Sequence, residues 1–195
     1  MRAPVHELHA ANLLTYVSLV CAVTASMAHG HRAWAGVGLA LAVVADTFDG
    51  RFARAFARTG RQHLIGRELD SLVDAIAFGL APVMVLAATA RHTGVVGVLC
   101  WWIASAAYVG AAVTRLAFYN VEGDSARFVG LPAPAAALIC ATSLVLPTPL
   151  WASAWPLVVG AVAMVAPFSF PRPHALGLAA FVVWALAVIA RLVRA

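Results

Sequence analysis

Four aspartates stand at helical spacings near the ends of two neighbouring apolar stretches. Asp46 and Asp49 lie three residues apart, and Asp70 and Asp74 lie four residues apart. Either spacing places both carboxylates of a pair on one face of an α-helix. Because the two stretches follow each other along the chain, we expect them to run antiparallel and to bring the four carboxylates together.

Carboxylates gathered in this way are suited to binding divalent cations. Hard cations such as Mg²⁺ and Mn²⁺ prefer oxygen ligands, and a set of this size is compatible with a two-metal site. Ionised groups at membrane depth are costly unless they are paired or bound to metal. The alternative interpretation is a charged collar at the membrane interface, in which the aspartates pair with Arg51, Arg54 and neighbouring arginines.

The sequence around the aspartates is strongly apolar. The chain has 195 residues, of which 63% are hydrophobic, whereas a soluble domain is usually about half apolar. Long uncharged runs recur along the chain, and about twenty apolar residues cross a bilayer as a helix. The expected fold class is therefore all-α: a polytopic integral membrane protein with about six to seven transmembrane helices. We expect one membrane-embedded domain over residues 1–195.

The expected spans place the polar connections on one side of the membrane. They cover residues 12–29, 33–57, 66–90, 94–121, 130–147, 151–169 and 174–193. The connections at 58–65, 121–129 and 170–173 then share a side. Five arginines lie between residues 51 and 67, and arginine-rich connections are typically cytoplasmic. We therefore expect the acidic cluster at the cytoplasmic face of the cell membrane.

The positive charge of the chain does not indicate nucleic-acid binding. The net charge is +5, and all 13 basic residues are arginines. No soluble basic face exists to carry a nucleic-acid site, and arginines beside membrane spans fix topology or meet lipid phosphates.

The four aspartates belong to a longer motif. It reads Asp46-x-x-Asp49-Gly50-x-x-Ala53-Arg54, followed by Gly66-x-x-x-Asp70-x-x-x-Asp74. This pattern resembles the signature of the CDP-alcohol phosphotransferase family. Eleven residues separate Arg54 from Gly66, which is more than the family usually has, so we interpret residues 55–65 as an enlarged loop.

Other stretches are similar to the phosphatidylserine synthase subfamily. These are ELDSLVDAIAFGLAP (68–82), TRLAFYNV (114–121) and GLPAPAAA (130–137). Phe118 stands where the subfamily often has a second arginine. The stretch NLLT, Asn12 to Thr15, resembles the opening of the family's first span, so we expect that span to be retained rather than removed as a signal peptide. The resemblance covers about residues 12–137.

The resemblance implies an activity and roles for the motif residues. The activity is metal-assisted direct transfer of a phosphatidyl group from CDP-diacylglycerol to the hydroxyl group of L-serine, which gives phosphatidylserine and CMP. Asp74 is expected to act as general base. The expected ligands of Mg²⁺ or Mn²⁺, with two ions bound, are Asp46, Asp49, Asp70 and Asp74. The expected nucleotide- and phosphate-binding residues are Gly50, Ala53, Arg54 and Gly66.

The sequence leaves alternatives for the acceptor alcohol and for the functional class. Arg115 is expected to face the serine carboxylate or a phosphate, and its alternative is an arginine that extends to the interface from the end of its span. Glycerol phosphate, inositol phosphate or choline could replace serine, because the signature is shared. A divalent-cation transporter is the alternative of another class, although transporter sites usually lie at the membrane midplane. The resemblance is also compatible with a homodimer. Membrane lipids are the other expected partners.

Overall fold

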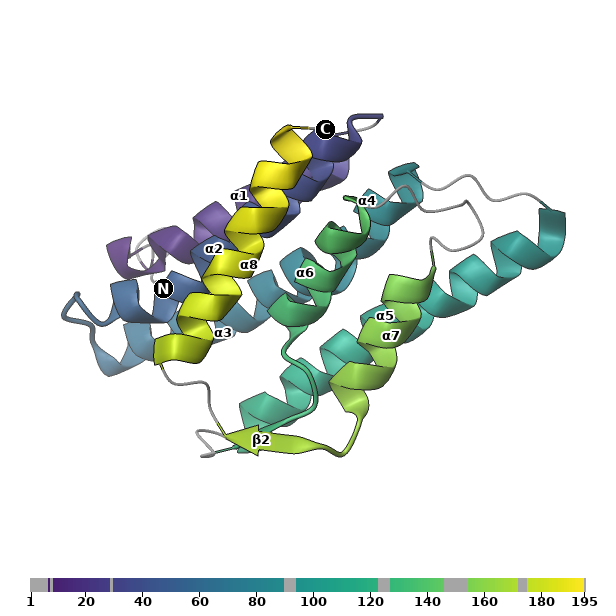
Figure 1. Ribbon diagram of the computed structural model, residues 1–195. Helices are drawn as coiled ribbons and strands as arrows, with labels where there is room; N and C mark the ends of the chain where they lie inside the picture. The colour runs from purple at the N-terminus through teal and green to yellow at the C-terminus, as the bar shows by residue number, and fades with distance from the viewer. Residues whose placement is uncertain are drawn as a thin grey trace.

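The computed structural model describes residue 7 and residues 9–28, 30–89, 94–122, 127–145, 154–171 and 175–194. Over these residues the chain forms an elongated bundle of helices (Figure 1). The 3₁₀ turn η2 (Ala10–Asn12) leads into α1 (Leu13–Met27), which α2 (Arg32–Ala53) follows. Helix α3 (Gly60–Asp74), the π-helical segment η3 (Ala75–Leu80) and α4 (Ala81–Thr89) form one continuous rod. The remaining helices are α5 (Gly94–Glu122), α6 (Ala133–Ser143), α7 (Trp155–Val165) and α8 (Ala175–Val193).

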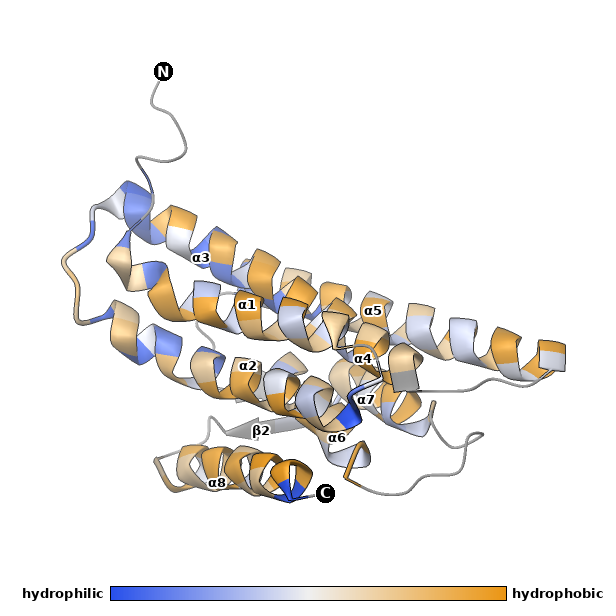
Figure 2. Ribbon diagram, turned by 90° about the horizontal axis from the view of Figure 1, so that it is seen from above, coloured by the Kyte–Doolittle hydropathy of each residue, from blue (hydrophilic) through white to orange (hydrophobic). Residues whose placement is uncertain are grey.

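Five of the described helical stretches are long and apolar enough to cross a membrane. They are Ala10–Met27, Arg32–Ala53, Gly60–Ala88, Gly94–Glu122 and Ala175–Val193. Helices α6 and α7 are apolar but shorter. Hydrophilic residues gather where α2 ends and α3 begins (Figure 2). The predicted class, a polytopic all-α membrane protein, is therefore confirmed.

A short strand pair joins two of the polar connections. Strands β1 (Arg127–Val129) and β2 (Ser169–Pro171) are antiparallel, with Phe128 opposite Phe170. The sequence patterns gave no signal for this pair, although the two connections were expected on the same side of the membrane. Gly130 follows β1 with a φ of 67°, and a side chain there would meet the carbonyl group of Met164. The turn therefore requires glycine.

The core of the bundle is built on small residues of α2, which packs against α1, α6 and α8. Ala40, Ala42 and Val43 are completely buried. A methyl group at Gly38 would lie 2.9 Å from Cβ of Ala25, so glycine lets α1 and α2 approach closely. Membrane helices associate through such close backbone contact, because lipid supplies no hydrophobic drive between them.

The rod that carries two of the aspartates contains an irregular segment. Asp74 ends α3 and the π-helical segment η3 begins at the next residue. Pro82 has no N–H to donate to the carbonyl group of Phe78, four residues earlier. The hydroxyl group of Tyr108 on α5 donates to that carbonyl at 3.0 Å, and Tyr108 is completely buried. A neighbouring helix thus satisfies the backbone acceptor that proline leaves open.

Helix α3 begins earlier than the sequence analysis predicted. We expected the span to start near residue 66, after an enlarged loop over 55–65, but α3 starts at Gly60. Thr59 caps it: the Gln62 amide N–H donates to the Thr59 hydroxyl at 3.3 Å, and the Thr59 N–H donates to Oε1 of Gln62 at 3.0 Å. This reciprocal pair is a capping box, and the Thr-x-x-Gln spacing that signals it was present in the sequence.

Replacement of Tyr108 by phenylalanine tests the link between α5 and η3. The change removes one buried hydroxyl and leaves the Phe78 carbonyl without a donor, which costs about 1–3 kcal/mol of unfolding free energy. We expect a lower thermal unfolding midpoint in detergent. Tyr16→Phe is the control, because the structure gives the Tyr16 hydroxyl no hydrogen-bond partner among the described residues. Equal midpoints for the two variants would contradict the assigned role of Tyr108.

Candidate active site

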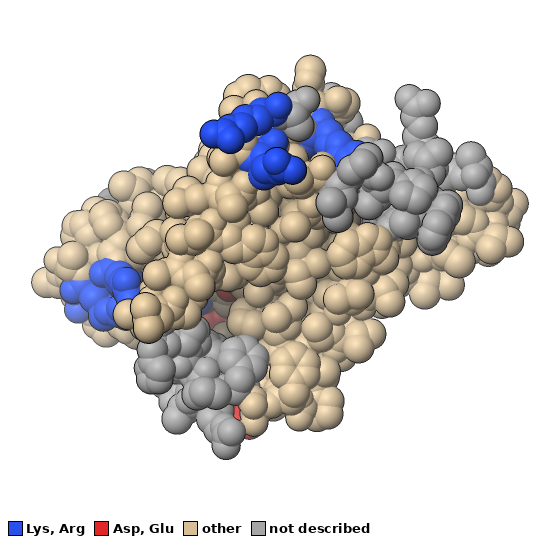
Figure 3. Space-filling model, in the orientation of Figure 1, with Lys and Arg blue, Asp and Glu red and all other residues tan. Residues whose placement is uncertain are grey.

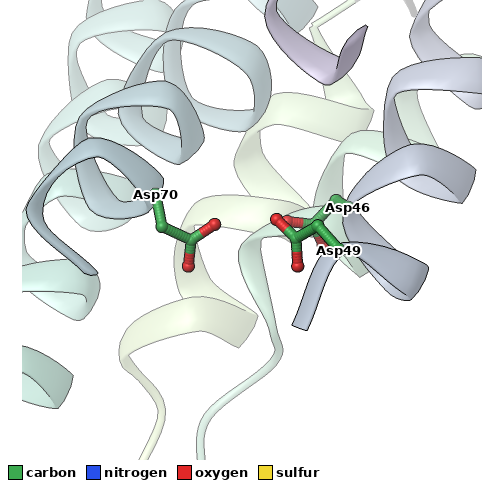
Figure 4. Close-up of side chains that lie close together, drawn as sticks. All are labelled: Asp46, Asp49 and Asp70. Atoms are coloured by element: carbon green, nitrogen blue, oxygen red, sulfur yellow. The ribbon is translucent and has the colours of Figure 1, made fainter. Parts of the chain in front are cut away.

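Three aspartates form a compact acidic group near the ends of α2 and α3. Helix α2 contributes Asp46 and Asp49, and α3 contributes Asp70. One carboxylate oxygen from each lies within 4.8 Å of the others. The carboxylate of Asp70 points across from α3 toward the pair on α2 (Figure 4). The predicted antiparallel arrangement of the two spans therefore brings both acidic pairs to one place.

Asp74 lies one helical turn after Asp70 on α3. Its carboxyl group lies near that of Asp46. It is not part of the compact group of three. The fourth aspartate therefore adjoins the group on the side of Asp46, at the point where α3 passes into the π-helical segment.

The acidic group has the donor set and the size of a divalent-cation site. Oxygen ligands of Mg²⁺ or Ca²⁺ lie about 2.0–2.6 Å from the ion, so ligands of one ion lie within about 5 Å of one another. The three carboxylates meet that limit. Within the described residues the ion pairs are Arg61–Glu7 and Arg67–Glu68, so the alternative of a collar that pairs the aspartates with Arg51 and Arg54 is not observed.

A cleft of about 300 Å³ opens beside two of these carboxylates, Asp49 and Asp70. It lies between the start of α1, the end of α2 and the first turns of α3. Its other lining residues are Ala11, Asn12, Thr15, Gly50, Ala53, Arg54, Arg58, His63, Gly66 and Arg67. In the space-filling view, a few acidic atoms are visible in a recess of the surface, and basic atoms form patches at the top and at the left of the same face (Figure 3).

All four predicted nucleotide-binding residues line this cleft: Gly50, Ala53, Arg54 and Gly66. A methyl group at Gly50 would approach only Nη1 of Arg54, at 4.0 Å. A methyl group at Gly66 would lie 3.1 Å from Oδ1 of Asn12 and 3.2 Å from Nη1 of Arg58. The two glycines therefore keep the cleft open beside the carboxylates.

The η2 turn and helix α1 supply two polar residues, Asn12 and Thr15, whose role the sequence analysis did not identify. Thr15 donates a hydrogen bond from its hydroxyl group to Oδ2 of Asp49 at 3.3 Å. Asn12 is buried and faces Gly66 across the cleft. Both belong to the NLLT stretch, which the resemblance identified only as the opening of the first span. A polar residue at the start of an apolar helix was the available signal.

Basic side chains line the cleft together with the two carboxylates. Arg54, Arg58, His63 and Arg67 all line it. Arg58 and His63 fall in the segment where the family motif could not be aligned, so sequence reasoning assigned them no role. A cleft lined by both carboxylates and guanidinium groups suits a ligand that presents phosphates to the guanidinium groups and a bound cation to the carboxylates.

Arg115 does not line this cleft. It lies on α5 with 8% of its surface exposed, and its guanidinium carbon is 4.5 Å from the ring centre of Tyr119. Its Nε is buried and has no hydrogen-bond partner within the described residues. Asp74 is the motif aspartate near Arg115, and Asp74 does not line the cleft either, whereas Asp49 and Asp70 do.

Comparison with known proteins agrees with the family resemblance that the motif indicated. The family model described as CDP-alcohol phosphatidyltransferase matches residues 8–190. The chain is 36% identical over 160 residues to the CDP-diacylglycerol–serine O-phosphatidyltransferase of Mycobacterium leprae, which covers 75% of this chain and 51% of the relative. It is 34% identical over 156 residues to the enzyme of that name from Mycobacterium tuberculosis, which covers 73% and 52%.

A less similar relative is named for the synthesis of a different lipid. The archaetidylserine synthase of Methanothermobacter thermautotrophicus is 31% identical over 143 residues, which is 70% of this chain and 58% of the relative. The chain spans about half the length of the curated relatives it matches. Together with the five apolar helices, the family match makes this chain an integral membrane protein.

Direct titration with Mn²⁺ tests the acidic group. We expect Asp49→Asn to weaken Mn²⁺ binding by about tenfold or more, because one charged ligand is lost. Electron paramagnetic resonance of free Mn²⁺ measures the affinity of the purified protein. Glu68→Gln is the matched control, since Glu68 is an exposed carboxylate on α3 outside the group. If both variants bind Mn²⁺ as the unsubstituted protein does, the ion is bound elsewhere.

Proposed function

The chain belongs to the CDP-alcohol phosphatidyltransferase family, and from that premise we propose that it transfers a phosphatidyl group from CDP-diacylglycerol to the hydroxyl group of L-serine. The products would be phosphatidylserine and CMP. The observation that carries the proposal is the acidic group of Asp46, Asp49 and Asp70 beside a cleft that the other motif residues line. Serine is preferred as acceptor because the relatives at 34–36% identity are named for it.

The location of the cleft fits a lipid substrate. It lies at the ends of α1, α2 and α3, where hydrophilic residues replace apolar ones (Figure 2). A lipid with its acyl chains in the bilayer would present its diphosphate at this level, and water-soluble serine could reach the same place. A site at the end of the membrane helices therefore meets both demands.

Divalent cations are part of the proposal. We propose that Asp46, Asp49 and Asp70 bind Mg²⁺ or Mn²⁺, and that Asp74 completes a site for a second ion. When bound, the metal would neutralise the diphosphate and make its phosphorus atoms more electrophilic.

The residues of the chain would then position and deprotonate the reactants. Arg54 would contact the diphosphate from the rim of the cleft, and Gly50 and Gly66 would admit the nucleotide because they carry no side chain. Asp74 would accept the proton of the attacking hydroxyl group. The serine oxygen would bond to the phosphorus that carries diacylglycerol, and the bond from that phosphorus to CMP would break.

Arg115 would bind the acceptor on the far side of the acidic group. Its buried Nε has no partner within the described residues, and Asp74 is the motif aspartate near its side chain. A serine carboxylate between Asp74 and Arg115 would use that donor and place the serine hydroxyl near the base. The aromatic ring of Tyr119 fixes the guanidinium from one face.

We further propose that the cleft opens to the cytoplasm and that the chain acts as a homodimer. Arg51, Arg54, Arg58, Arg61 and Arg67 surround the α2–α3 end, and arginine-rich connections are retained on the cytoplasmic side. Labelling of single introduced cysteines in intact cells tests on which side of the membrane the cleft opens. Light scattering in detergent measures the mass of the protein and so tests the homodimer.

Release of CMP by the purified protein tests the reaction. The protein is incubated with CDP-diacylglycerol, Mn²⁺ or Mg²⁺, and separately with serine, glycerol phosphate, inositol phosphate or choline. The proposal expects CMP and phosphatidylserine with serine alone. CMP release with another alcohol would change the acceptor, and Mn²⁺ uptake into vesicles without CMP release would favour a divalent-cation transporter.

Asp74→Asn separates the proposed base from the nucleotide site. The amide cannot accept the hydroxyl proton, so we expect turnover to fall by about 100-fold or more. CDP affinity should fall much less, because Asp74 is outside the compact group of three. Turnover at the rate of the unsubstituted protein would show that another group takes the proton.

Arg115→Lys tests the acceptor site with less risk to folding than truncation. Lysine keeps the charge but loses the planar donor pair that matches a carboxylate. We expect the KM for serine to rise by about tenfold, the equivalent of about 1.4 kcal/mol, with the KM for CDP-diacylglycerol unchanged. An unchanged KM for serine would remove Arg115 from the acceptor site.

A further inference from the structure

The connection between α2 and α3 holds an arginine over the cleft. Phe56, in the middle of this connection, packs on Phe52 with ring centres 5.1 Å apart and on His9 at 6.1 Å. Thr59, at its end, forms the capping box with Gln62. Arg58 therefore lies between two anchored residues, and its backbone is held at both sides.

The guanidinium group of Arg58 reaches into the cleft. Its Nη1 lies 3.2 Å from the position of a methyl group on Gly66, and the residue is half-buried. Asp49 and Asp70 line the same cleft. Arg58 thus approaches the backbone of the glycine that stands one helical turn before Asp70.

The charge of Arg58 has no counter-charge in the described part of the chain. The ion pairs found there join Arg61 to Glu7 and Arg67 to Glu68. Arg58 is the arginine whose guanidinium group lies beside Gly66. A half-buried guanidinium without a carboxylate partner, aimed into an open cleft, is suited to binding an anion, and its rigid fork of donors matches a phosphate group.

The surroundings favour a nucleoside diphosphate over a simple anion. The carboxylates that line the cleft would repel a bare phosphate, whereas a diphosphate that carries a divalent cation presents positive charge to the carboxylates and oxygen atoms to the guanidinium groups. Asn12 adds a buried amide on the same side as Arg58. The cleft volume of about 300 Å³ is at the lower end of the range for small-molecule sites, which is about 300–1,000 Å³.

We propose that Arg58 is a substrate-binding residue that contacts the diphosphate of the CDP-lipid, and that the long connection before α3 serves to place it there. The inference rests on the proposed function, since it assumes that a cytidine diphosphate occupies the cleft. A phosphate on the acceptor could offer the same chemistry, but Arg58 lines the cleft together with Gly50, Arg54 and Gly66, whereas Arg115 does not line it, and this assigns Arg58 to the donor lipid.

The test compares three variants of the full chain in detergent: Arg58→Ala, Arg58→Lys and Arg51→Ala. Arg51 is the matched control, because it is an exposed arginine at the end of α2 that does not line the cleft. Calorimetry measures CDP binding with Mn²⁺ present, and the CMP assay measures KM for CDP-diacylglycerol and for serine separately. The thermal midpoint of each variant reports on folding.

Arg58→Ala is expected to raise the Kd for CDP and the KM for CDP-diacylglycerol by about tenfold to a hundredfold, the range for one charged hydrogen bond. Arg58→Lys should recover part of the loss, and Arg51→Ala should match the unsubstituted protein. The KM for serine and the thermal midpoint should not change.

Two results would overturn the inference and leave the proposed function standing. One is an active protein in which Arg58→Ala binds CDP as Arg51→Ala does. The other is an Arg58→Ala variant in which only the KM for serine rises. A weaker binding of CDP that comes with a lower thermal midpoint would likewise count against the inference. If the unsubstituted protein neither binds CDP nor releases CMP, the proposed function fails and the inference fails with it.

Discussion

Repulsion among carboxylates at the end of a membrane bundle is the constraint on which the site depends. Oxygens of Asp46, Asp49 and Asp70 lie within 4.8 Å of one another, and like charges at that separation repel more strongly where water is scarce. No arginine pairs with them among the described residues. Thr15 donates a hydrogen bond to only one of the three. Cations at the centre would relieve this repulsion, so the geometry of the three carboxylates is suited to binding divalent ions.

The helices around the cluster keep that geometry while the cleft stays open. Close packing of α1 on α2, which Gly38 permits, places Thr15 beside Asp49. The π-helical segment begins directly after Asp74, and the hydrogen bond from Tyr108 fixes it to α5. Irregular backbone of this kind is tolerated in a membrane only where neighbouring helices satisfy it. The buried parts of the helices are thus held by packing and hydrogen bonds, and the polar ends of α1, α2 and α3 line the cleft.

Sequence reasoning predicted the parts of this protein that periodicity and spacing encode. Uncharged runs located the helices, and the spacing of the aspartates located the acidic group. It did not predict the start of α3, because the capping box at Thr59 lay inside a stretch interpreted as loop. It missed Arg58, since a rim position depends on how the connection folds. It also missed the pairing of β1 with β2 and the separation of Arg115 from the cleft, both of which depend on contacts between distant segments.

The central claim is that Asp46, Asp49 and Asp70 surround a divalent cation. X-ray diffraction at the manganese absorption edge, from crystals of the protein grown with Mn²⁺ and CDP, measures this directly. The account predicts an anomalous peak between the three carboxylates, with the diphosphate beside it in the cleft. A manganese peak elsewhere, or three carboxylates bonded to arginine side chains with no peak among them, would contradict it.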